Sequence, residues 1–141
     1  MAEEVSDSPS AWVARHIRRF IETNGHPRPG VNDLLLTTRG RKTGRLRRTA
    51  LVYVRDGDSY VLAASDAGSD RHPSWYLNLL DDPEVVLEVG GERFPAVART
   101  ATPEEKPRLW RSIAAAMPSY QDYQDATARE IPVVVVDRRA P

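Results

Sequence analysis

Short apolar segments separated by glycine-containing turns constrain the fold of this chain more than any other feature of its sequence. Val31 to Thr38 is an apolar run, Arg47 to Val54 follows a basic turn, and Ser59 to Ala64 follows Arg55-Asp56-Gly57-Asp58. Runs of this length bounded by turn residues are typical of strands, and glycine tolerates the positive φ that tight hairpins demand. We therefore expect these three segments to form an antiparallel meander.

The second half of the chain continues the pattern. Glu84 to Val89 and Glu92 to Thr100 flank Gly90-Gly91 as a second hairpin, and Ile131 to Asp137 is the last strand. Six strands joined mostly by hairpins would leave open edges in a flat sheet, so we expect closure into a small barrel. The predicted class is α+β, a six-stranded antiparallel barrel with peripheral helices.

Helical signals separate the strands. Ser10 can cap a helix over residues 11–23, Pro73 suits the start of a short helix over 74–80, and Thr102 to Glu105 is a capping box for a helix to about Met117. A Tyr-rich turn or short helix spans 119–127. We divide the chain into residues 1–30, comprising a frayed tail, an amphipathic helix and a linker, and residues 31–141, the barrel domain.

Composition excludes several classes of function. The chain has no cysteine, which excludes disulfides, thiolate metal sites and a cysteine nucleophile. Its 20 basic and 20 acidic residues balance, so the whole chain has no electrostatic bias toward nucleic acid or an anionic membrane. No apolar run approaches the ~20 residues of a membrane span, and the acidic start Met-Ala-Glu-Glu is not typical of a secretory signal. We expect a cytoplasmic protein.

The turn after the first strand is strongly basic. Six of the ten residues from Arg39 to Arg48 are cations, none is acidic, and Gly40 and Gly44 lie among them. Such side chains suit phosphate or carboxylate, and glycines let backbone amides approach an anion. The same residues fit a solvated hairpin tip without a ligand about equally well. Nucleic acid and a phosphorylated cofactor are both candidate partners.

Two further segments could line a ligand pocket. Small residues at 63–65 permit close approach by a flat ring, which Trp75 could cover and Asn78 could hydrogen-bond. Tyr120 and Tyr123 are one helical turn apart and could orient a carbonyl or nitro oxygen. Simple core packing of the Trp75 helix and a half-buried surface turn at the tyrosines are the alternatives. The three histidines lack metal-ligand spacing, and nucleophile-elbow and Rossmann motifs are missing, so a cofactor would supply the chemistry.

These segments together resemble the deazaflavin-dependent nitroreductase family of actinobacteria, whose cofactor is coenzyme F420. The resemblance runs from about Asp33 to Val136 and is strongest at 35–44, 75–79 and 118–124. It implies a split β-barrel like that of FMN-binding oxidases. It also implies an F420-dependent reductase that passes a hydride from reduced deazaflavin to a quinone or a nitroaromatic acceptor of the nitroimidazole type.

The resemblance implies the site residues as well. The basic turn would hold the phosphate and acidic tail of the cofactor, and the other segments would surround its ring. The implied cofactor-binding residues are Arg41, Lys42, Thr43, Arg47, Arg48, Thr49, Ala50, Leu51, Val52, Ala63, Ala64, Ser65, Asp66, Ser74, Trp75, Tyr76, Leu77, Asn78 and Tyr120. Ser65, Tyr120 and Tyr123 would be the catalytic residues that contact the acceptor.

The chain departs from the family at several of these positions. Asp66 stands where relatives often carry Lys, so one cationic contact to the anionic tail would be lost or reversed. Ala50, Val52 and Met117 replace a proline and two aromatic residues, which bears on the acceptor. An FMN-binding split-barrel oxidoreductase and a nucleic-acid-binding barrel stay open as alternatives, the second disfavoured by the zero net charge.

The resemblance also implies partners. A separate dehydrogenase would reduce F420, no nucleic acid would bind, and a homodimer is compatible with the family. The helix over residues 10–23 sets Trp12 and Phe20 opposite Arg15 and Arg18, as interfacial helices do, so peripheral contact with the inner face of the membrane stays open. Packing of its apolar stripe on the barrel is the commoner arrangement.

Overall fold

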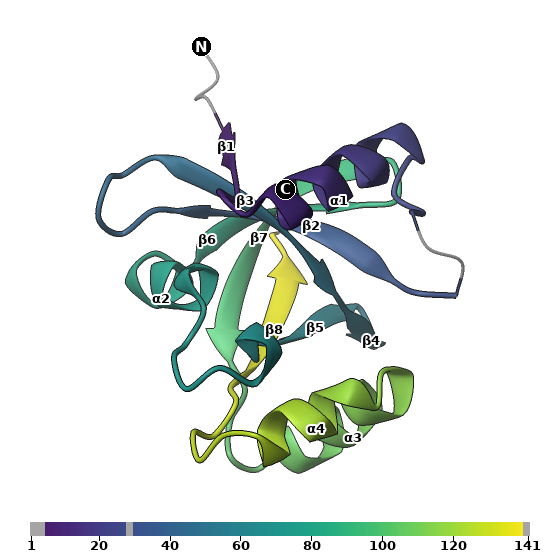
Figure 1. The fold of residues 1–141 in the computed structure, drawn as a ribbon, viewed down its shortest axis with the longest axis vertical. Helices are drawn as coiled ribbons and strands as arrows, with labels where there is room; N and C mark the ends of the chain where they lie inside the picture. The colour runs from purple at the N-terminus through teal and green to yellow at the C-terminus, as the bar shows by residue number, and fades with distance from the viewer. Residues whose placement is uncertain (1–4, 28–29, 140–141) are drawn as a thin grey trace.

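The computed structural model describes residues 5–27 and 30–139, which form one sheet of eight strands with four α-helices. The strands are β1 (Val5–Asp7), β2 (Asp33–Arg39), β3 (Leu46–Val52), β4 (Val54–Asp56), β5 (Ser59–Ala63), β6 (Glu84–Val89), β7 (Glu92–Thr100) and β8 (Val133–Arg138). The helices are α1 (Ala11–Glu22), α2 (Ser74–Asp81), α3 (Lys106–Ala116) and α4 (Ser119–Asp125), with a 3-10 turn, η1, over Asp66–Gly68. Figure 1 shows α1 at one end of the molecule and the α3–α4 pair at the other.

The sheet confirms the α+β class but not the six-stranded antiparallel barrel. Its strand order is β1-β3-β2-β6-β7-β8-β5-β4, with β1 parallel to β3 and the other pairs antiparallel. Within the described residues no ladder joins the β1–β3 end to β4, so the sheet is open. The hairpin of β6 and β7 forms as expected, with Val89 opposite Glu92.

The expected meander is confirmed in two of its pairings, β2 with β3 and the hairpin of β4 and β5 around Gly57. It is wrong as one continuous meander because the chain leaves the β2–β3 ladder at Tyr53. β3 ends at Val52 and β4 begins at Val54, although the two strands stand toward opposite ends of the strand order. The amide of Tyr53 donates to the carbonyl of Asn32 at 3.0 Å. β5 therefore pairs with β4 and β8 rather than with β3. The sheet therefore curves, so that the single residue Tyr53 links β3, near one end of the strand order, to β4 at the other end.

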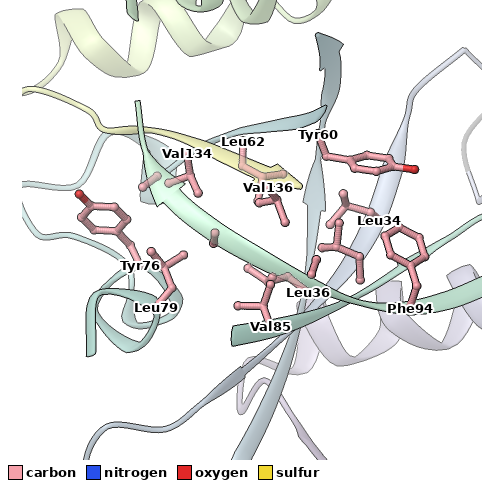
Figure 2. Close-up of a cluster of buried hydrophobic side chains, with 14 residues drawn as sticks. Leu34, Leu36, Tyr60, Leu62, Tyr76, Leu79, Val85, Phe94, Val134 and Val136 are labelled. Atoms are coloured by element: carbon pink, nitrogen blue, oxygen red, sulfur yellow. The ribbon is translucent and has the colours of Figure 1, made fainter. Parts of the chain in front are cut away.

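Three hydrophobic clusters hold this arrangement. The largest lies inside the curved sheet and includes Leu34, Leu36, Leu62 and Val134 (Figure 2). A second joins α3 and α4 to β5 and β8. In the third, Ile17 and Phe20 of α1 pack on Leu35 of β2, so the apolar stripe of this helix covers the sheet.

The N-terminal segment is more ordered than expected. Residues 1–4 of the predicted tail lie outside the described residues, but Val5–Asp7 pair with Leu46–Arg48 as β1. Ser10 caps α1 as predicted, because its side chain accepts from the amide of Val13 at 3.4 Å. Trp12 and Ile21 remain exposed on this helix. In the described ranges, none of the helices is long and apolar enough to cross a membrane.

Candidate cofactor and acceptor groove

A single cavity of about 850 Å³ brings together the three segments singled out in the sequence. β3 runs along it, the basic turn lies at one end, and the loop after β5, α2 and α4 form a wall. The predicted residues that line it are Arg41, Lys42, Thr43, Arg47, Arg48, Thr49, Ala50, Leu51, Val52, Ala63, Ser65, Asp66, Ser74, Trp75, Asn78, Tyr120 and Tyr123. The residues of the basic turn and of the tyrosine pair therefore share one space.

Backbone hydrogen bonds close the basic turn. The amide of Gly40 donates to the carbonyl of Arg45 at 2.7 Å, and that of Gly44 donates to the carbonyl of Gly40 at 2.8 Å. Gly44 has a φ of +72°, which favours glycine. A Cβ at Gly40 would lie 3.0 Å from Oγ1 of Thr43 and 3.1 Å from the carbonyl of Arg45. The glycines therefore keep the turn compact, with exposed Arg41 and Lys42 at the groove.

Asn78 ties α2 to this turn. Its Oδ1 accepts from the backbone amide of Arg41 at 3.1 Å and from the Arg41 guanidinium at 2.8 Å. Its Nδ2 donates to Oγ1 of Thr38 at 3.2 Å. Asn78 is buried, so these bonds replace water that the amide has lost. The amide thus positions a cation of the groove rather than serving only as a ligand contact.

Arg48 is held by acidic partners at the edge of the sheet. Its guanidinium lies 2.6 Å from Oδ1 of Asp7 and 3.4 Å from Oε2 of Glu88. The hydrogen bond to Asp7 is the largest of the contributions that raise the pKa of Arg48. Part of its charge is therefore already neutralised, unlike the exposed cations of the turn.

The loop after β5 is clamped by Arg129. This guanidinium donates to the carbonyls of Ala64 at 3.1 Å, Ser65 at 2.9 Å and Ser69 at 3.0 Å. Inside the loop, Asp66 and Ala67 have φ values of +46° and +54°, a strained conformation for residues with a side chain. The clamp therefore holds Ser65 and Asp66 in the wall of the groove. Sequence reasoning missed Arg129, since a lone arginine in a polar segment carries no signal.

The tyrosine pair closes the far end of the wall. The rings of Tyr120 and Tyr123 meet edge to face, with centroids 5.7 Å apart. Gly68 packs against α4 so closely that a Cβ there would lie 3.0 Å from the carbonyl of Tyr123. Trp110 of α3 donates from Nε1 to Gln121 at 2.9 Å, which fixes α4 on α3. The helix that carries both tyrosines is therefore held in place by its contacts with Gly68 and with α3.

Three predicted residues do not line the groove. Ala64 is fully buried in the core, Leu77 is half-buried, and the hydroxyl of buried Tyr76 is bonded to Thr100 at 2.9 Å. Conversely, the sequence analysis did not place residues 8–10, α1 or Asp33 at the groove, yet Trp12, His16 and Asp33 line it. The described residues hold no cluster of three or more potential metal ligands.

A long groove with cations at one end and aromatic and apolar walls at the other is typical of a domain that holds a large, flat, anionic cofactor. The donors of the basic turn suit phosphate and carboxylate groups, and the small side chains of Ala50 and Ala63 leave room for a ring. The fold and the groove thus define the class of the protein as a cofactor-dependent enzyme.

Comparison with known proteins gives the family. A model of the F420H(2)-dependent quinone reductase family matches residues 11–138. The F420H(2)-dependent quinone reductase Rv1261c of Mycobacterium tuberculosis is 40% identical over 146 residues, which cover 92% of this chain and 98% of the relative. The chain therefore belongs to the F420H(2)-dependent quinone reductase family and is an F420-dependent oxidoreductase, as its resemblance predicted.

Solved structures agree with this assignment. One described as an F420-H2 dependent reductase is 36% identical, with a TM-score of 0.70, and the match covers 75% of this chain and 94% of the other. Another, described as a domain-swapped dimer, is 35% identical, with a TM-score of 0.71, and covers 92% of this chain and 100% of the other. The groove thus lies on a scaffold shared with an F420-dependent enzyme.

Proposed function

We propose that this protein reduces a quinone or a nitroaromatic compound with a hydride from reduced coenzyme F420, which it holds in the groove along β3. The observation that carries the proposal is the continuous cavity from the basic turn to the tyrosine pair. Its volume of about 850 Å³ lies within the roughly 300–1,000 Å³ typical of ligand sites. The bound deazaflavin would supply the hydride.

The basic turn would bind the anionic tail. Arg41, Lys42 and Arg47 are exposed at the groove, and charge-assisted bonds from such groups to phosphate are stronger than neutral ones. The hydroxyl of Thr43 accepts from the amide of Arg45 at 3.2 Å, which leaves its own proton available to an anion. Tail binding of this kind weakens with added salt.

The middle of the groove would hold the ring. Thr49 to Val52 and Ala63 to Asp66 would flank it, and Trp75 would cover it from α2. Tyr120 would close the groove at α4. The side chains of Ser65 and Tyr120 would hydrogen-bond the acceptor and stabilise the negative charge that develops on its oxygen. The chain's contribution is then positioning rather than strong acid catalysis.

A fluorescence titration with oxidised F420, with FMN in parallel, tests this proposal first. We expect saturable binding of F420 and none of FMN, followed by anaerobic oxidation of reduced F420 by menadione. Lys42→Gln should weaken F420 binding by about two- to fivefold. Arg45→Gln, an exposed cation of the same turn that does not line the groove, is the matched control. Tight FMN binding, or binding of neither, would overturn the proposal.

A homodimer is the assembly we propose, since the solved structure described as a domain-swapped dimer matches this chain over 92% of its length. Sedimentation of the purified protein tests it directly.

A further inference from the structure

One wall of the groove is built by the N-terminal helix and carries a buried histidine–aspartate pair. His16 of α1 and Asp33 of β2 both line the cavity, with Nε2 of His16 3.4 Å from Oδ1 of Asp33. The Asp33 side chain is 1% exposed and that of His16 is 12% exposed. A buried carboxylate is costly without a partner, and the imidazole of His16 is one such partner.

An exposed aromatic ring lies beside this pair. The ring of Trp12 stacks parallel on His16, with centroids 5.8 Å apart and an interplanar angle of 5°. Trp12 is 64% exposed, and among the exposed large hydrophobic residues of the described chain it alone lines the cavity. Val13, one residue on, packs against the cluster of Ile17, Phe20 and Leu35, which fixes this part of α1 on the sheet. The wall is therefore preformed and offers a bare aromatic face.

Strand register places this pair far from the basic turn. Asp33 lies opposite Val52. Arg39 lies six residues further along β2, opposite Leu46, and the basic turn connects these two residues. At roughly 3.3 Å per residue, about 20 Å of strand separates the two ends. Val52 packs against the cluster that contains Tyr120 and borders Tyr123 and Met117. The His16–Asp33 pair therefore stands at the tyrosine end of the groove.

Charge divides the groove in the same way. The cations of the basic turn attract an anionic tail, whereas the acidic residues among the described lining are Asp33 and Asp66. The carboxylate of Asp33 at the α1 end does not attract an anionic tail. Val13, Ala50 and Val52 add apolar surface there. This end suits a flat, uncharged ring with a polar oxygen.

We infer that His16, oriented by Asp33 and flanked by Trp12, forms the binding subsite for the acceptor. Nε2 of His16 faces Asp33, and its Nδ1–H donates to a carbonyl oxygen of a quinone, whose ring lies against Trp12. The bond strengthens as negative charge grows on that oxygen, and the wall opposite Tyr120 thus takes part in acceptor recognition. The inference rests on the proposed function, since the deazaflavin must occupy the middle of the groove.

Variants of the full chain separate this role from cofactor binding. His16→Gln and Asp33→Asn should lower kcat/KM for menadione at least about tenfold, while the Kd for oxidised F420 stays within about twofold of wild type. Trp12→Ala should raise the KM for menadione more than it lowers kcat. His26→Gln, at an exposed histidine outside the groove, is the matched control and should change neither quantity.

The outcomes are distinct. Unchanged kcat/KM in both His16→Gln and Trp12→Ala, with normal wild-type turnover, would overturn this inference alone. So would a loss of F420 affinity as large as the loss of kcat/KM, because the wall would then serve the cofactor or the fold. Should His16→Gln fail to fold, Trp12→Ala still decides, since its side chain is exposed. Failure of the wild-type protein to bind F420 would overturn the proposed function and this subsite with it.

Discussion

The guanidinium of Arg129 lies 2.8 Å from Nδ1 of His72, so the ring nitrogen accepts and the imidazole is neutral, with its proton on Nε2. Burial first, and then the charge of Arg129, hold the pKa of His72 below its ordinary value of 6.5. The neutral ring packs against the ring of Tyr76, with centroids 5.0 Å apart. A titratable group is thus built into the clamp that holds one wall of the groove.

This relationship predicts an acid-labile clamp. Because the pKa is lowered in the folded chain, the unfolded chain binds the proton more readily, so stability is complete above the unfolded pKa of about 6.5. It is lost as the pH falls from there through the lower folded pKa. His72→Asn, which keeps an acceptor but cannot titrate, should flatten this dependence in urea unfolding between about pH 5 and 8. The same change at exposed His26 should leave it in place.

Replacing Arg129 should damage the groove as well as stability. Arg129→Met leaves the carbonyls of Ala64, Ser65 and Ser69 without this donor, at a cost of about 2–4 kcal/mol. Because Ser65 and Asp66 would relax, F420 should bind more weakly even at temperatures where the variant is folded. Arg129→Lys should recover part of the stability but less of the affinity, since one ammonium cannot bridge all three carbonyls. Arg93→Met, at an exposed position of β7, is the control for both unfolding and titration.

Local patterns explain which parts of the fold were predictable. The β6–β7 hairpin and the start of α1 follow from Gly90-Gly91 and the cap at Ser10, because both signals act within a few residues. The three segments that line the groove were recognised from their own residues. Each of these inferences needed no knowledge of how distant strands pair.

The features of the fold and groove that the sequence analysis missed depend on contacts between residues far apart in the chain. Three residues of β1 carry too short a pattern to predict a parallel pairing with β3 across about forty residues. The break at Tyr53 sends β4 to the other end of the strand order, and nothing in the alternation of residues 47–54 marks it. For the same reason, the contribution of His16 and Asp33 to the groove emerges only once α1 is packed on the sheet.

Asn78 should affect cofactor binding through Arg41. Asn78→Ala removes an acceptor that holds both the amide and the guanidinium of Arg41, and we expect F420 binding to weaken about five- to twentyfold. In an Arg41→Gln background the same substitution should have little further effect, since the group that it positions is gone. Fluorescence titrations of the two single variants and the double variant measure the coupling. Additive losses would show that Asn78 acts independently of Arg41.

Tyr120 should matter more for turnover than for binding. Tyr120→Phe keeps the ring that packs on Tyr123 but removes the hydroxyl, so kcat with menadione should fall about tenfold to a hundredfold with little change in F420 affinity. Tyr120→Ala should lower both. Tyr60→Phe, within the sheet core and away from the groove, is the matched control. Equal turnover in wild type and Tyr120→Phe would remove the hydroxyl from the mechanism.

Asp66 should weaken the binding of an anionic cofactor. It is exposed, lines the groove and is itself one of the two strained residues of η1. A carboxylate at this position repels a negative tail. Asp66→Asn should therefore tighten F420 binding, and Asp66→Lys should tighten it further, by about three- to tenfold in total at low ionic strength. The gain should shrink as salt approaches about 0.15 M, because exposed charges are screened over about 8 Å. Asp58→Lys makes the same change of charge on the β4–β5 hairpin, outside the groove, and separates this local effect from one of net charge. An equal gain in both lysine variants would mean that overall charge, not the position of Asp66, governs the affinity.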